Sequence, residues 1–144
     1  MAQVISKLLE HSNNFIANQL LIVAGAKTYG PPGTLSKGVQ AVSVFANDVL
    51  KLQNIHVVEG SGISRKNRIS AQDLLAVLEA FEPYYRLMPR EGQAFYKSGT
   101  LSGISARAGY LKIKTGETYR FVVLLNTPGK SVDRIMNILL HALE

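Results

Sequence analysis

Apolar residues recur at intervals of three and four positions through the first part of the chain, which is the spacing of a buried helix face. This pattern runs from Val4 to Ala26 and is interrupted at Ser12-Asn13-Asn14. The side chains of serine and asparagine compete for backbone hydrogen bonds, so they favour caps and turns over helix interiors. We therefore predict two helices that meet at this point, with Ser12 or Asn13 capping the second.

The same spacing returns twice before residue 83. Residues 29–33 form a loop rich in glycine and proline, after which Thr34 can cap a helix with an apolar face that reaches residue 50. Ser70 and Asp73 resemble the start of a further helix, which Pro83 ends or kinks.

The regions beside this last helix are less regular. Residues 55–58 are a short strand candidate and are followed by a loop over residues 59–68. Residues 84–93 have no periodic pattern and are interpreted as irregular.

The pattern changes again after residue 93. Residues 94–97, 106–114 and 118–126 are predicted to be strands, and the last two are joined by a tight hairpin. A final helix is predicted to begin at Ser131. We thus expect an α+β fold, in which a helical half is followed by a three-stranded antiparallel sheet with a C-terminal helix packed on it.

Composition narrows the class of protein. A chain of 144 residues, 47% hydrophobic and 18% charged, is typical of one folded domain. Its net charge of +6 is dispersed and lacks an RNA-reading aromatic signature, so we expect a solvated basic surface and no nucleic-acid partner.

Other classes of site and location have little support. With no cysteine and three scattered histidines, neither a metal site nor another cofactor is expected. The longest apolar run, around residues 19–26, is far shorter than the roughly 20 residues of a membrane span. No stretch has the pattern of an export signal, so we expect none in this chain.

Two short motifs indicate a chemistry. Lys97-Ser98-Gly99-Thr100 follows a short apolar strand, and Ser12-x-Asn14 lies at the first helix junction. Lys-Thr/Ser-Gly and Ser-x-Asn are two of the three signatures of serine acyl-transferases that act on D-Ala-D-Ala peptides and β-lactams. The third, Ser-x-x-Lys, carries the attacking serine, and no serine of the chain has a lysine three positions later.

Two other short motifs compete with this interpretation. Lys114-Thr115-Gly116 also matches Lys-Thr-Gly, but it lies at a predicted hairpin tip where Thr-Gly is ordinary turn chemistry. Gly60-Ser61-Gly62 follows a strand as in dinucleotide-binding loops, yet Arg65 stands where the third glycine belongs. Neither motif changes the interpretation.

Taken in order, three segments resemble the D-alanyl-D-alanine carboxypeptidase/endopeptidase family of low-molecular-mass class C penicillin-binding proteins, the S13 peptidases. These segments are residues 8–17, 60–67 and 97–101, and the strand at residues 108–110 also fits. The resemblance covers nearly the whole chain. It implies a partial penicillin-binding/β-lactamase-like transpeptidase fold, in which residues 1–144 are the C-terminal part of the catalytic domain and lack the upstream Ser-x-x-Lys segment.

The resemblance also implies roles for nine residues. Ser12 would relay a proton to the leaving D-alanine, and Asn14 would orient the substrate amide and the absent lysine. Lys97 would present its charge to the terminal carboxylate of the peptide. Substrate-binding groups would be supplied by Ser98, Gly99, Thr100, Gly60, Ser61 and Arg65.

The implied parent protein is a serine-type peptidase of the periplasm or extracytoplasmic cell envelope, with peptidoglycan stem peptides and β-lactams as ligands. Without its nucleophile, the isolated chain would be inactive. The alternative is a non-catalytic module that binds peptidoglycan peptides or a partner. A missing strand would leave a sheet edge open, which favours self-association.

Overall fold

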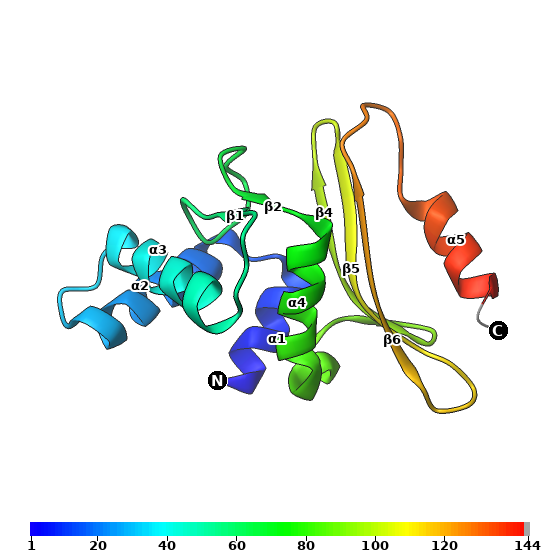
Figure 1. Cartoon of the computed structure of the whole chain (residues 1–144), viewed down its shortest axis with the longest axis horizontal. Coiled ribbons are helices and arrows are strands. Elements are labelled where there is room, and N and C mark those ends of the chain that lie inside the picture. Colours follow the sequence, from blue (N-terminus) through cyan, green and yellow to red (C-terminus); the bar gives the residue numbers. More distant parts are fainter. Residues whose placement is uncertain (143–144) are drawn as a thin grey trace.

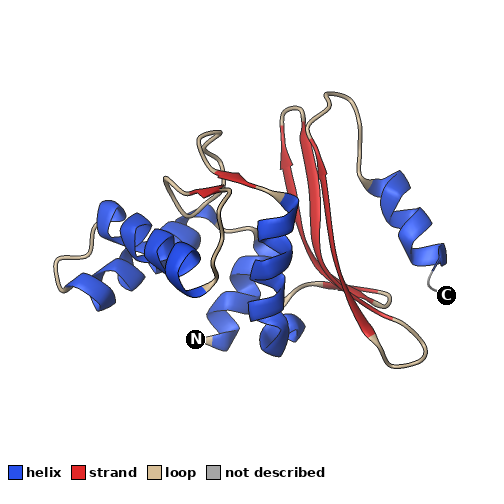
Figure 2. Cartoon of the chain, viewed as in Figure 1, coloured by secondary structure: helices blue, strands red, loops and turns tan. Residues whose placement is uncertain are grey.

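The computed structural model describes residues 1–142, and the structural statements below concern these residues. A helical part comes first along the chain and a twisted antiparallel sheet follows (Figures 1 and 2). The helices are α1 (Ala2–His11), α2 (Asn14–Tyr29), α3 (Leu35–Val44), the π-helix η1 (Phe45–Val49), α4 (Ala71–Phe81), the 3-10 helix η2 (Glu82–Leu87) and α5 (Asp133–Ala142). Among the described residues, no helix has the length and apolar character to cross a membrane.

Three helices begin where a polar side chain can accept a backbone hydrogen bond, as their sequences predict. The side chain of Asn13 accepts from the amide of Ile16 at 3.0 Å, and this bond starts α2. Thr34 and Ser70 do the same at the starts of α3 and α4. The helix predicted to reach residue 50 changes at Phe45 from α to π geometry, which periodicity alone did not indicate.

The sheet has four strands where three were predicted. They are β3 (Arg90–Glu91), β4 (Ala94–Leu101), β5 (Ile104–Lys112) and β6 (Thr118–Leu125), in the order β3-β4-β5-β6 and all antiparallel. The extra strand, β3, is two residues long and turns back onto β4 through Gly92, which has a φ of 58°. A strand this short has no periodicity to detect, so residues 84–93 were wrongly interpreted as irregular throughout.

Two further strands, β1 (Ile55–His56) and β2 (Arg68–Ile69), pair antiparallel as a separate ribbon. The strand predicted at residues 55–58 is therefore present but shorter. Its partner, β2, lies where the sequence was interpreted as the end of a loop.

The sheet lies between helices (Figure 1). On one face, the fully buried Tyr110 of β5 donates its hydroxyl hydrogen to the carbonyl of Leu78 in α4. Burial of this phenol raises its pKa to about 12. On the other face, Val132 is fully buried just before α5, and its amide donates to Ser105 of β5 at 3.4 Å. The C-terminal helix is thus packed on the sheet as predicted, beginning at Asp133 rather than Ser131.

Candidate functional site

Lys97 and Ser12 meet in the structure although 85 positions separate them. Lys97 lies on β4, and its ammonium donates to the Ser12 hydroxyl and to the carbonyl of Ser98, the latter at 2.7 Å. Ser12 ends α1 in the left-handed conformation, with a φ of 51°, so the chain turns sharply there before α2. The turn that interrupts the helical pattern therefore presents a hydroxyl to the lysine of the sheet.

The ammonium of Lys97 is half-buried and has no carboxylate partner among the described residues. Burial and the nearby charge of Arg107 together lower its pKa below the ordinary value of 10.5. A partly desolvated cation that is hydrogen-bonded only to a hydroxyl and a carbonyl is available to an external anion.

Arg107 is a site residue that sequence reasoning missed. It lies on β5 directly opposite Ser98, and both residues line a hollow of ≈ 220 Å³ together with Lys97. Its guanidinium lies 3.2 Å from Asp133 of α5 and 5.8 Å from the centre of the Tyr96 ring. The strand register could have identified Arg107, but this register can be predicted only after the short turn between β4 and β5 has been located.

Among the residues that the structure describes, the outer edge of β4 is unpaired beyond its contacts with β3 and Pro89. The amide of Tyr96 donates outward, to the carbonyl of Pro89 at 3.0 Å. Because amides in an antiparallel ladder alternate between the two edges, those of Ser98 and Thr100 also point outward. Both residues are exposed, so this edge offers free backbone donors beside Lys97.

Gly99 lies between these two residues, and little surrounds it. A Cβ atom built there would approach one other atom, the Cβ of Ala106, at an ordinary 3.7 Å. No packing within the described chain therefore requires glycine at this position. A strand position without a side chain allows the backbone of another chain to approach closely.

The loop that carries the predicted substrate-binding residues Gly60, Ser61 and Arg65 is held together by Glu59, a second residue that sequence reasoning missed. Its carboxylate accepts hydrogen bonds from the amides of Ser61, Gly62 and Ser64 and from the side chain of Asn67. Burial alone would raise the pKa of Glu59, but these hydrogen bonds hold it below its usual value. No motif marks a carboxylate that organises its own loop, so Glu59 could not be identified from the sequence.

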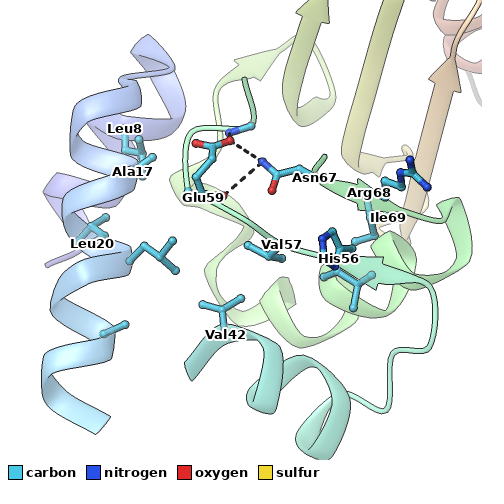
Figure 3. Close-up of a pocket in the computed structure, with 15 residues that line it drawn as sticks. Leu8, Ala17, Leu20, Val42, His56, Val57, Glu59, Asn67, Arg68 and Ile69 are labelled. Atoms are coloured by element: carbon cyan, nitrogen blue, oxygen red, sulfur yellow. Dashed lines mark hydrogen bonds between the residues drawn. The ribbon is translucent and has the colours of Figure 1, made fainter. Parts of the chain in front are cut away.

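Gly60 and Ser61 lie apart from the hollow beside Lys97. Gly60 packs against α2, where an added Cβ would be 2.7 Å from the carbonyl of Ala17, and the Ser61 hydroxyl donates to Glu59. The loop also borders a larger, mostly apolar cavity of ≈ 530 Å³ between α2 and the β1–β2 ribbon, which shares no lining residue with the first hollow (Figure 3).

Arg65 connects this loop to the sheet. Its guanidinium donates to the carbonyl of Ser102, in the turn between β4 and β5, at 2.6 Å. The edge of β4 is thus bounded by Ser12 near Lys97 and by Arg65 at its far end. Asn14 is exposed at the first position of α2, two residues beyond Ser12.

The geometry brings together a cation, a hydroxyl and free strand amides around one edge, a combination suited to holding the carboxylate end of an extended peptide. In the described part of the chain, no group of three or more histidine, aspartate or glutamate side chains is arranged to hold a metal ion.

Residues 1–87 match the D-Ala-D-Ala carboxypeptidase 3 (S13) family. The chain belongs to the S13 family. This result confirms the family expected from the motifs. The chain is also similar to the D-alanyl-D-alanine carboxypeptidase DacB of Haemophilus influenzae, at 25% identity over 151 aligned positions. That alignment covers 88% of this chain and 32% of the relative, so this S13 chain spans about a third of the length of the curated protein.

Two solved bacterial structures share the fold of this chain. Penicillin-binding protein 4 of Haemophilus influenzae, complexed with a β-lactam, superposes with a TM-score of 0.81 at 21% identity, covering 97% of this chain and 40% of that one. A predatory endopeptidase of Bdellovibrio bacteriovorus, in complex with an immunity protein, gives a TM-score of 0.75 at 20% identity, covering 99% of this chain and 43% of that one. The expected α+β fold of penicillin-binding enzymes is confirmed, with four strands in the sheet.

Proposed function

We propose that this chain is the C-terminal part of the catalytic domain of a serine-type D-Ala-D-Ala carboxypeptidase or endopeptidase of the cell envelope. In this proposal it holds the D-Ala-D-Ala end of a peptidoglycan stem peptide along the outer edge of β4. The contact between Lys97 and Ser12, beside an unpaired strand edge, is the observation that carries the proposal. Membership of the S13 family and the similarity to DacB support it.

The substrate carboxylate would lie in the hollow that Lys97, Ser98 and Arg107 line. The Lys97 ammonium, which has no carboxylate partner among the described residues, and the Ser98 hydroxyl favour a carboxylate over a neutral group, because charge-assisted hydrogen bonds are the stronger ones. Arg107 adds positive charge although it is paired with Asp133. Two carboxylates also line the hollow, but Glu10 is paired with Lys7 and Glu91 accepts from the Tyr96 hydroxyl. The peptide would run as an added strand beside β4, and the Thr100 amide would be one donor to the oxyanion.

Ser12 is suited to relay a proton. A hydroxyl both donates and accepts, and this one already accepts from the Lys97 ammonium. It could therefore pass a proton toward the amine of the leaving D-alanine while the ammonium stabilises the developing charge. Asn14 would orient the peptide amide from the start of α2.

The acylated serine would come from a segment outside these 144 residues, because the chain contains no Ser-x-x-Lys. The isolated chain is therefore proposed to recognise the peptide without forming an acyl-enzyme. A covalent adduct with labelled penicillin, detected by mass spectrometry of this chain, would show that the nucleophile has been misassigned.

The proposal is tested by titrating the ¹⁵N-labelled chain with a peptide that ends in D-Ala-D-Ala. We expect saturable chemical-shift changes at the amides of residues 97–101 and at Ser12 to Asn14, with a much smaller response to the same peptide ending in L-Ala-L-Ala. Equal responses to both peptides, or changes confined to other surfaces, would contradict the proposed recognition.

Peptide binding is also expected to depend on pH through Lys97. The folded protein lowers the pKa of this ammonium, so the cation that pairs with the peptide carboxylate is lost at a pH below the ordinary 10.5. Affinity should fall as the pH rises through the lowered pKa. The Lys97→Arg variant should retain its charge, so a decline that is the same in both proteins would assign the titration to another group.

A further inference from the structure

A second hollow, of ≈ 650 Å³, lies at the end of the sheet where β4 begins and β5 ends. Four of its eight lining residues carry a positive charge, namely Arg86, Arg90, Lys112 and Lys114, and none carries a negative one. It shares Arg90 alone with the hollow beside Lys97. We call it the basic pocket.

Aromatic rings hold three of these cations in place. The guanidinium of Arg86 lies 5.7 Å from the centre of the Tyr85 ring, and the ammonium of Lys112 lies 6.0 Å from the same ring. Arg90 lies 5.5 Å from the centre of the Phe95 ring. The two rings contact each other edge to face at 4.9 Å. The cations are therefore positioned before any ligand arrives, which reduces the entropy lost on binding.

Three of these cations, Arg86, Arg90 and Lys112, form no ion pair with a carboxylate in the described part of the chain. Arg86 donates to the Tyr85 hydroxyl at 3.2 Å, and Arg90 donates to the carbonyl of Gly92 at 2.9 Å. The hydrogen bond from Arg86 and the nearby charges of Arg86 and Lys112 lower the pKa of Tyr85.

We propose that the basic pocket binds a multivalent phosphate-type anion, with a diphosphate group as its preferred ligand. Guanidinium groups pair with phosphate oxygens in a fixed two-pronged geometry, and the Lys112 ammonium adds a third donor group. Several cations around one concave space favour a compact anion of high charge over a single carboxylate. The volume exceeds what one phosphate fills, so it accommodates two linked phosphates or a phosphate attached to a larger molecule.

The experiment is calorimetric titration of the intact chain with inorganic pyrophosphate and, separately, with inorganic phosphate at fixed ionic strength. We expect saturable binding that is tighter for pyrophosphate than for phosphate. The double variant Arg86→Gln/Arg90→Gln should bind at least about tenfold more weakly, because it loses charged hydrogen bonds to the anion. Both positions are exposed, so the fold should tolerate the substitutions.

The matched control is Lys27→Gln/Lys130→Gln, which removes the same charge from exposed positions outside the pocket. It should retain the affinity of the unchanged protein, and so should Lys97→Ala, which separates this site from peptide recognition. Equal weakening by the control pair, or the absence of saturable binding, would overturn the proposal.

Discussion

Replacing Lys97 with alanine is expected to weaken binding of a D-Ala-D-Ala peptide by about 30-fold or more while the chain still folds. Removing one partner of a close charge pair typically costs about 2 kcal/mol or more, which is about 30-fold in affinity. The fold should tolerate the change because the ammonium is half-buried and has no carboxylate partner among residues 1–142, and because burial and Arg107 lower its pKa. Chemical-shift titration gives the affinity, and thermal unfolding checks the fold.

Lys114→Ala is the matched control for this prediction. Lys114 belongs to the second Lys-Thr-Gly match, and it is exposed just before the turn that joins β5 to β6. Its removal should leave peptide affinity unchanged within about twofold, since simple surface substitutions have effects of this order. If the two variants lost affinity equally, the peptide would be bound by general charge attraction rather than by the geometry around Lys97.

Gly109→Ala is expected to destabilise the protein by about 3 kcal/mol, among the larger effects of a single added methyl group. Gly109 of β5 pairs with Tyr96 of β4, and a Cβ at this position would lie 2.1 Å from the carbonyl oxygen of Phe95. The clash is with backbone, which cannot rotate away as a side chain can. For a domain of this size the midpoint of thermal unfolding should fall by roughly 10 °C.

Gly99→Ala tests the same substitution on the neighbouring strand, where the added methyl has ordinary space. Its stability should stay within about 1 kcal/mol of the original, because alanine also restricts the unfolded chain. Peptide binding should nevertheless weaken, since the methyl would project beside the edge of β4 where the peptide is proposed to lie. A strong loss of stability for Gly99→Ala, or none for Gly109→Ala, would show that the packing around β4 differs from the structure described.

Local chemistry made most of the elements predictable. Asn13, Thr34 and Ser70 are good N-caps on sequence grounds, and each starts a helix in the structure. The three long strands follow from their composition and from the hairpin between the last two. The elements that were not predicted are short or unusual in geometry. A two-residue strand such as β3, and the π-helix η1 that begins at Phe45, have no periodicity of their own.

The site was partly predictable for a different reason. Lys97 and Ser12 could be chosen because each belongs to a recognisable motif, although nothing local requires them to meet. Arg107 and Glu59 belong to no motif, and their importance depends on strand register and on a loop that closes around a carboxylate. Such contributions come from tertiary structure, which a single sequence does not display.

The separation of Ser12 and Lys97 along the chain has a consequence for heating or denaturant experiments. One residue ends a helix near the N-terminus and the other lies on a strand of the sheet, so the pair exists while these two parts remain docked. A small separation of α1 from the sheet would break the contact between Lys97 and Ser12 while the hydrogen bonds between the strands remained. Ligand affinity should therefore decline at milder conditions than circular dichroism does, and it would report the earliest loosening of the molecule.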